Sequence, residues 1–270
     1  RSSPRSDRGA RGGPRPGHTT AGLRGRCVTI RPVPDRLPLI VAHRGDPSQA
    51  PENTVAAFRK AVALGVEMIE LDVHLSRDGE PVIMHDFDVD RCTDGHGRIA
   101  EMTLAELRAL DAGGWFSAGY AGERIPTLSE ALAAIPAPVQ INMHLKPFDP
   151  RSDAFERLVL EHIRRFEIAG RLIVVHDAAE SLRRLRALEP GLTCCLLPPP
   201  GVDGRGYVDA AAAEGLRVLQ PDRGHMSADF LAYAHEKGMR ANVFYADTAE
   251  DMNLYMDWGV DGILTNVRVG

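Results

Sequence analysis

Two carboxylates stand two residues apart in an apolar run of this 270-residue chain, Glu70 and Asp72 in the stretch 66–72. Side chains alternate faces along a strand, so both carboxylates should point the same way. Like charges side by side repel each other unless a cation lies between them. The spacing therefore predicts a divalent-metal site, with a salt-bridged strand end as the alternative.

Histidines and basic side chains close three other apolar runs. His43 and Arg44 follow 39–42, His85 follows 81–84, and His144 and Lys146 end 138–145. Two histidines can supply a general base and a general acid near neutral pH. A cation and two basic side chains suit a phosphate group, whose charge rises as a phosphodiester is attacked. Each residue alone is also typical of a solvated strand end, but together they predict phosphoryl chemistry.

The composition is ordinary for a soluble globular protein, with 44% hydrophobic residues, 26% charged residues and a formal net charge of −5. This balance does not favour a nucleic-acid partner. No apolar run is long enough to span a bilayer, and no apolar signal-peptide core follows the basic N-terminus. Neither a zinc site nor a disulfide framework is indicated by the spacing of Cys27, Cys92, Cys194 and Cys195. We therefore expect a cytoplasmic, reduced protein.

Residues 1–36 differ from the rest of the chain. Arg, Gly, Pro and Ser dominate, and no apolar periodicity begins before Val28. Such a segment cannot bury enough surface to order itself, so we expect a disordered N-terminal extension or a mis-assigned start, since the sequence lacks an initiating Met. A basic arm for nucleic acid or membrane is the alternative. The second unit would be one domain over 37–270.

From Leu37 onward, apolar runs alternate with amphipathic stretches. Strands are expected at 39–42, 66–72, 81–85, 138–145, 172–176, 193–197, 216–220, 240–245 and 260–265. Helices are expected at 54–64, 127–134, 153–166, 179–188, 207–214, 228–237 and 248–257, with a short one after the capping box Thr103-x-x-Glu106. For the helix at 153–166, Asp153 and Glu156 are the expected cap pair.

Alternation of this kind is typical of parallel βα units. No Gly-rich nucleotide loop follows the first strand, which disfavours a doubly wound sheet. We predict a TIM (β/α)8 barrel with a small insertion, 87–124, after the third strand. Eight strands close such a barrel, and the nine candidates mean that the last is a short extra or that one assignment is wrong. The strands 66–72 and 81–85 are expected to end at the same rim, where active sites of this fold lie.

A set of spaced motifs from Leu39 onward resembles the glycerophosphodiester phosphodiesterase family. The motifs are His43-Arg44-Gly45, Pro51-Glu52-Asn53-Thr54, Glu70-x-Asp72, Asp78-Gly79, Val82-x-x-His85-Asp86, Asp111-Ala112-Gly113, Ile125-Pro126-Thr127-Leu128, Asn142-x-x-x-Lys146 and Gly259-Val260-Asp261-Gly262. The resemblance implies a TIM barrel that hydrolyses glycerophosphodiesters to glycerol 3-phosphate and an alcohol with a divalent cation.

The same resemblance implies a role for each matching residue. His43 and His85 match the catalytic histidines, Glu70 and Asp72 match metal ligands, and Arg44 and Lys146 match groups that contact the phosphate. Which histidine is the base stays open, as does the nucleophile, which is water or a neighbouring glycerol hydroxyl.

Three positions depart from the family pattern. His144 stands where the family usually has a glutamate ligand, so the cation is expected among Mg²⁺, Ca²⁺ and Mn²⁺ with His144 as the third ligand. The run Phe244-Tyr245-Ala246-Asp247 replaces Trp-Thr-x-Asn, at the wall expected to face glycerol. Thr265-Asn266 replaces Thr-Asp, with no interpretation from the sequence.

Two rival functions remain open. The same chemistry on a lysophospholipid predicts an apolar groove from Trp115, Phe116 and Tyr120. Loss of catalysis through the change at His144 would leave a phosphodiester-binding protein. His176 and Asp177 stand where the family more often has a Ser-Phe pair. They could contact the leaving group, or they could be solvated residues at the rim.

Overall fold

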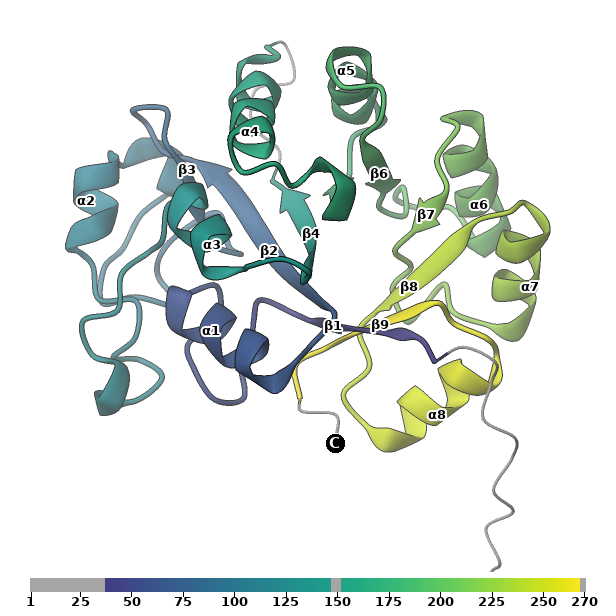
Figure 1. Ribbon diagram of the computed structural model, residues 1–270, viewed down its shortest axis with the longest axis horizontal. Helices are drawn as coiled ribbons and strands as arrows, with labels where there is room; N and C mark the ends of the chain where they lie inside the picture. Colours follow the sequence, from purple (N-terminus) through teal and green to yellow (C-terminus); the bar gives the residue numbers. More distant parts are fainter. Residues whose placement is uncertain (1–36, 147–151, 268–270) are drawn as a thin grey trace, which may run out of the picture. The chain divides into compact units, whose positions relative to one another are not determined.

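A computed structural model of the protein describes residues 37–146 and 152–267. The expected disordered extension at 1–36 lies outside the described residues. Among the residues described, eight parallel strands form one ring, in which β1 pairs with both β9 and β2 (Figure 1). The ring strands are β1 (Leu39–Ala42), β2 (Met68–Leu75), β4 (Gln140–Leu145), β5 (Leu172–His176), β6 (Thr193–Leu196), β7 (Val218–Leu219), β8 (Arg240–Phe244) and β9 (Gly262–Thr265). The predicted barrel is confirmed.

The remaining strand, β3 (Pro81–Ile83), corrects one expectation. It runs antiparallel to β2 and is not a barrel strand. β2 continues past the rim to Leu75, and a turn at 76–80 sends the chain back, with Ser76 N bonded to Glu80 O at 3.0 Å. His85 therefore reaches the rim from above, on a returning strand. The insertion, counted along the chain after β3, lies between the second and third barrel strands.

Helices lie outside the ring of strands in Figure 1. They are α1 (Val55–Leu64), α2 (Leu104–Ala109), α3 (Leu128–Ala134), α4 (Ala154–Arg165), α5 (Ala179–Leu188), α6 (Gly204–Ala213), α7 (Ala228–Glu236) and α8 (Ala249–Asp257). Single 3-10 turns are η1 (Ile99–Glu101), η2 (Ala118–Tyr120) and η3 (Ala169–Arg171). The predicted capping box at Thr103 and Glu106 is confirmed, and Thr127 and Glu130 form a capping box at the start of α3.

The expected cap pair at the start of α4 is wrong. Asp153 is the N-cap residue but makes no side-chain cap hydrogen bond, and its carboxylate instead accepts from Arg157 Nε at 2.8 Å. Glu156 is buried and accepts from Ser181 Oγ at 2.5 Å and Arg184 Nη2 at 2.7 Å. A buried carboxylate needs such partners, and they outweigh a local cap.

Two apolar layers hold the barrel together. Inside it, strand side chains such as Val41, Met68, Val175 and Leu264 form one cluster. A larger cluster fills the space between strands and helices, including Ala42 and Phe58. Because β1 contributes Val41 inward and Ala42 outward, the strand's alternation also directs His43 to the inner side.

The insertion has a small core of its own. Val82 of β3 and Met84 just after it pack with Ile99 and with Leu107 of α2. This packing fixes the segment that carries His85. No helix among the described residues meets the length and apolarity needed to cross a membrane.

Candidate active site

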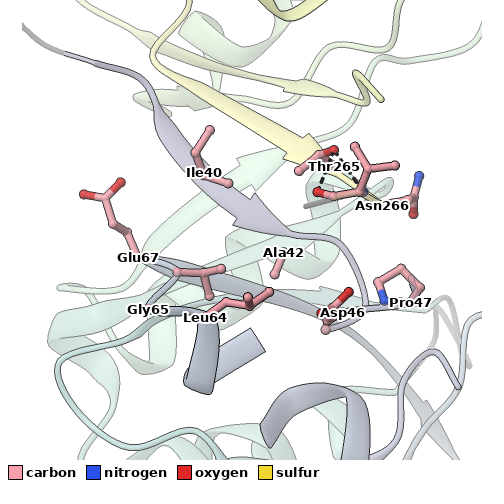
Figure 2. Close-up of a pocket in the computed structure, with 12 residues that line it drawn as sticks. Ile40, Ala42, Asp46, Pro47, Leu64, Gly65, Glu67, Thr265 and Asn266 are labelled. Carbon is pink, nitrogen blue, oxygen red and sulfur yellow. Dashed lines mark hydrogen bonds between the residues drawn. The ribbon is translucent and has the colours of Figure 1, made fainter. Parts of the chain in front are cut away.

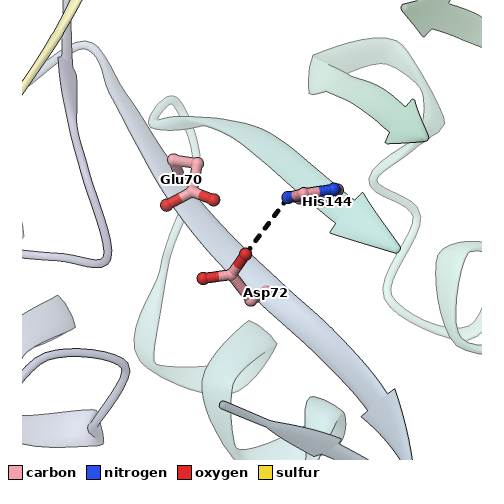
Figure 3. Close-up of side chains that lie close together, drawn as sticks. All are labelled: Glu70, Asp72 and His144. Carbon is pink, nitrogen blue, oxygen red and sulfur yellow. Dashed lines mark ion pairs between the residues drawn. The ribbon is translucent and has the colours of Figure 1, made fainter. Parts of the chain in front are cut away.

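Strand register brings the predicted metal ligands together at one rim. Asp72 of β2 lies opposite His144 of β4, one step beyond the pair Leu71 and Met143. One ligand atom from each of Glu70, Asp72 and His144 lies within 4.8 Å of the others (Figure 3). Both carboxylates are at least 98% buried, and His144 Nδ1 lies 3.2 Å from Asp72 Oδ1. The three side chains thus form one compact group.

The two buried carboxylates of this group have pKa values shifted in opposite directions. Burial and the neighbouring charge of Asp72 raise the pKa of Glu70 to about 8. Burial opposes ionisation of Asp72 too, but the His144 hydrogen bond and the Lys146 charge outweigh it and hold its pKa well below the usual range. Asp72 Oδ1 lies 2.8 Å from Lys146 Nζ and 3.2 Å from His144 Nδ1, and neither contact meets full hydrogen-bond geometry.

A divalent cation fits this donor set. Two carboxylates supply hard oxygen ligands, and a neutral imidazole supplies a nitrogen ligand common in metal sites. A cation between Glu70 and Asp72 would remove the repulsion that raises the pKa of Glu70. The residues present therefore match the expected divalent-metal site.

Both predicted phosphate-contacting groups border the carboxylates. Lys146 Nζ lies 2.8 Å from Asp72 Oδ1 and 3.1 Å from His144 Nδ1. Arg44 Nε lies 3.7 Å from Asp72 Oδ2, and its backbone N–H donates to Glu70 Oε2 at 2.9 Å. Two cations next to a carboxylate pair can bind the anionic oxygens of a phosphodiester.

A tight loop after β1 places Arg44. Its φ is 59°, and the next residue, Gly45, has φ 91°. A Cβ at Gly45 would stand 2.7 Å from the backbone carbon of Ala57 in α1, so this close approach requires glycine. The loop is also fixed by Asn53, whose N–H donates to Arg44 O at 2.9 Å.

His43 is held by a contact at its Nδ1 and by two aromatic rings. Nδ1 lies 2.7 Å from Asn266 Oδ1, while Nε2 lies 3.9 Å from Glu70 Oε2. Tyr245 stacks on the ring at a centroid distance of 6.2 Å, and Phe244 meets it edge-on at 5.4 Å. Burial and the charge of Arg44 lower the pKa of His43 to about 4, so its neutral form is favoured.

His85 is held differently. Its Nδ1 lies 2.6 Å from the carboxylate of Asp86, which also accepts from Arg91 Nε at 2.7 Å. Arg91 in turn donates to Glu52, the carboxylate that also accepts from Arg44 Nη1 at 2.7 Å. Burial lowers the pKa of His85. This ion-pair network joins the insertion to the loop after β1.

Several side chains of the site were not predicted. Asn53 donates from Nδ2 to Asp72 Oδ2 at 2.9 Å and orients that carboxylate. His74, buried next to the site, extends the alternation that begins at Glu70, and that period of two was a usable signal. In the sequence, Asn266 and Asp247 were visible only as departures from the family pattern, because their roles depend on contacts between distant segments.

The alternatives at His176 are partly resolved by its local contacts. Its buried ring accepts the Ala178 N–H at Nδ1, at 2.8 Å, and Nδ1 also lies 2.9 Å from Asp177 Oδ1. These contacts cap the end of β5. They favour a structural role at the rim over a contact to the leaving group.

One pocket of about 210 Å³ lies behind the first strand and is not the site (Figure 2). Ile40 and Ala42 line it, and they face away from Val41 and His43. Gly65 and Thr265 close it on two sides. A second pocket, of about 580 Å³, lies at the rim beside Phe244, with Asp177, Gln220 and Asp222 in its lining.

Known proteins are similar to this chain in sequence and in fold. The profile of the glycerophosphoryl diester phosphodiesterase family matches residues 43–268. A glycerophosphodiester phosphodiesterase of Caldanaerobacter subterraneus subsp. tengcongensis is 35% identical over 229 residues, covering 84% of this chain and 93% of that protein. One from Bacillus subtilis is 30% identical over 251 residues, covering 86% and 84%.

Solved structures agree with these sequence matches. A phosphodiesterase from Oleispira antarctica, in complex with the product sn-glycerol-3-phosphate, superimposes with a TM-score of 0.78 at 28% identity and covers 85% of this chain and 93% of its own. A second structure, named putative glycerophosphoryl diester phosphodiesterase, from Silicibacter pomeroyi, gives 0.75 at 25% identity over 86% and 91%. The chain belongs to the glycerophosphoryl diester phosphodiesterase family.

Proposed function

We propose that the protein is a phosphoric diester hydrolase that cleaves glycerophosphodiesters to glycerol 3-phosphate and an alcohol. One observation carries the proposal. Two histidines, each held through Nδ1 by a separate partner, border a buried group of two carboxylates and one imidazole. Family membership and the product-bound relative from Oleispira antarctica support the same substrate class.

Each part of the site has a role in this reaction. Glu70, Asp72 and His144 would hold the divalent cation, which when bound supplies Lewis-acid stabilisation of the phosphate charge. Arg44 and Lys146 would bind and orient the non-bridging oxygens. His43 and His85 would move the protons to and from the attacking and leaving oxygens.

The Nδ1 partners of the two histidines support a different role for each ring. His85 faces the carboxylate of Asp86, which favours the imidazolium form and offsets part of the effect of burial on its pKa, so that the ring can donate a proton. His43 faces a neutral amide, is more deeply buried, and presents Nε2 toward Glu70. We therefore assign His43 as the general base that deprotonates the nucleophile and His85 as the general acid that protonates the leaving alkoxide.

The rim pocket beside Phe244 is the proposed place for glycerol. It adjoins His43 through the Phe244 ring, and Gln220 and Asp222 offer polar atoms for hydroxyl groups. The replacement of the family's Trp-Thr-x-Asn pattern by Phe244-Tyr245-Ala246-Asp247 would then change the wall of this pocket.

A lysophospholipid is the second candidate substrate. Phe87, Trp115 and Tyr245 are 47%, 43% and 38% exposed and offer apolar surface to solvent. Trp115, Phe116 and Tyr120 also form a chain of edge-to-face contacts. An apolar acyl chain would gain from such surface.

The proposed location is the cytoplasm, where thiols stay reduced. Cys92, Cys194 and Cys195, the cysteines within the described ranges, are unpaired and buried. Retention of both histidines and both carboxylates argues against a purely phosphodiester-binding role.

Release of glycerol 3-phosphate tests the proposal directly. Chelator-treated protein would be assayed on glycerophosphoethanolamine and on a lysophospholipid, each with added Mg²⁺, Ca²⁺ or Mn²⁺. The expected result is formation of glycerol 3-phosphate from glycerophosphoethanolamine only with a cation, and cleavage of the lysophospholipid would be followed by release of its head-group alcohol and lysophosphatidic acid. Faster turnover of the lysophospholipid would favour the second candidate, and no hydrolysis of either would refute the enzymatic role.

A further inference from the structure

Behind His43, on the side away from Glu70, a short chain of hydrogen bonds ends on the carboxylate of Asp247. His43 Nδ1 lies 2.7 Å from Asn266 Oδ1, and Asn266 Nδ2 donates to Asp247 Oδ2 at 2.8 Å. The other oxygen, Asp247 Oδ1, accepts from Asn266 N at 2.7 Å and from Thr265 Oγ1 at 3.1 Å. Both polar atoms of the Asn266 amide and both oxygens of Asp247 therefore have a partner in this series of hydrogen bonds.

The direction of these bonds is fixed by chemistry. An ionised carboxylate only accepts hydrogen bonds, so the amide atom that faces Asp247 must be the NH₂ group of Asn266. The amide oxygen then faces His43, and because this oxygen also only accepts, Nδ1 must carry the proton. In neutral His43 the lone pair is left on Nε2, the ring atom 3.9 Å from Glu70 Oε2.

We propose that Asp247 and Asn266 are positioning residues that hold His43 in the tautomer with a free Nε2 lone pair. The inference rests on the proposed role of His43 as general base, because only this tautomer can accept a proton on the side of the metal-binding group. Tyr245 and Phe244 fix the plane of the ring, while the Asn266 amide fixes which nitrogen is protonated. Sequence patterns had left Asn266 without an interpretation.

An isosteric change at Asp247 should invert the chain. In Asp247→Asn, the new Oδ1 keeps the bonds from Asn266 N and Thr265 Oγ1, so its NH₂ group would face that of Asn266. A half-turn of the Asn266 amide relieves this conflict of two donors. Its NH₂ group then faces His43 Nδ1, which must become the acceptor, and the proton moves to Nε2.

An exchange of the two residues should restore the tautomer. In the double variant Asp247→Asn/Asn266→Asp, the amide at 247 donates to the carboxylate at 266, and that carboxylate accepts from His43 Nδ1. Each hydrogen bond between residue 247, residue 266 and His43 then has a counterpart, and the negative charge has moved from position 247 to position 266. The single variant Asn266→Asp would instead set two carboxylates against each other at the native 2.8 Å contact.

The tautomer is measured directly by two-bond ¹H–¹⁵N correlation spectra of the full-length protein, with His43 assigned by comparison with His43→Gln. We expect Nδ1–H in the native protein and in the double variant, and Nε2–H in Asp247→Asn. The kcat of Asp247→Asn should fall by about a hundredfold or more, with KM within about threefold of the native value. The double variant should recover at least about tenfold of that loss.

Asp261→Asn is the matched control. Asp261 also accepts from a backbone N–H, that of Ala241 at 2.8 Å, and from a histidine, His235 Nε2 at 2.9 Å, just before β9 begins. Its substitution should change stability similarly while leaving kcat and the His43 spectrum unchanged. Thermal melts of all variants identify any that fails to fold.

Two outcomes overturn the inference. One is an unchanged His43 tautomer in folded Asp247→Asn, and the other is a double variant that stays as inactive as both single variants. If the native protein does not cleave glycerophosphodiesters, the proposed function fails, but the ring-nitrogen spectra still decide whether Asp247 sets the tautomer.

Discussion

Replacing His144 with glutamate should change which cation stabilises the protein. The native site offers two carboxylates and a neutral imidazole, whereas His144→Glu offers three carboxylates. Imidazole suits Mn²⁺, Zn²⁺ and other transition metals, and all-oxygen sites suit Mg²⁺ and Ca²⁺. We therefore expect the native protein to prefer Mn²⁺ or another transition metal, and the variant to shift toward Mg²⁺ and Ca²⁺.

The cost of the change without metal follows from the geometry. Above pH 8, where Glu70 is ionised as well as Asp72, a carboxylate at 144 would lie within 4.8 Å of both, and each repulsion is then worth roughly 3.5 kcal/mol at an effective dielectric constant of about 20. Attraction to Lys146, 3.1 Å from the present ring nitrogen, returns about 5 kcal/mol. The balance is a destabilisation of about 2 kcal/mol, or roughly 4 to 8 °C in Tm.

Thermal melts after chelator treatment, followed by titration with each cation, measure both effects. Turnover across the same metal series gives a second readout. His144→Gln is the control, because it supplies an oxygen ligand without adding charge. Above pH 8, His144→Gln should lower the Tm of the chelator-treated protein less than His144→Glu does.

The reasoning is refuted if the native protein is stabilised and activated best by Ca²⁺ or Mg²⁺. It is also refuted if His144→Glu leaves the order of metals unchanged. His144 would then be a rim histidine that contacts Lys146 and Asp72 beside a two-carboxylate site.

Three further predictions test other parts of the structure. His43→Ala or His85→Ala should each lower turnover by about a hundredfold to ten-thousandfold without unfolding the protein, and more than a third of native activity would contradict their roles. In chelator-treated protein, the pKa of Glu70 is about 8 in the folded state and about 4.5 in the unfolded state. The folded state therefore binds the proton more tightly, and the free energy of unfolding should fall as pH rises from about 4.5 to 8. The difference in Tm between the native protein and Glu70→Gln, measured across this pH range, isolates the contribution of Glu70. A bound cation should abolish this pH dependence. Deleting residues 1–36, which lack apolar periodicity before Val28, should change neither Tm nor turnover, and a clear drop in Tm would show that they pack on the barrel.

Much of the site was predictable because parallel strands end at one rim. His43 follows β1, His144 lies next to the end of β4, and Asp72 ends the apolar run 66–72, so the strand pattern alone brings them to the same edge even though β2 itself continues to Leu75. The pairing of Asp72 with His144 depends on register, but both lie near the ends of their apolar runs. The strand pattern is therefore enough to predict this group.

The direction of β3 was not predictable from its pattern. Alternation along a strand looks the same in parallel and antiparallel pairs, and residues 73–80 are long enough for either path. The deciding contacts are those of a hairpin, such as Gly79 N with Ser76 O at 3.0 Å and Ser76 Oγ with Asp78 Oδ1 at 2.7 Å. His85 was still placed correctly at the rim, because a strand that overshoots and returns ends where a shorter parallel strand would.

The roles of the two histidines differ in how far away their partners lie along the chain. Asp86 follows His85 directly, so a carboxylate beside that imidazole was visible in the sequence. Asn266 lies 223 residues from His43, and the barrel must close before the two can meet. Only the closed ring, in which β1 pairs with β9, sets a neutral amide against His43. The proposed assignment of base and acid therefore depends on the contact that sequence spacing shows least.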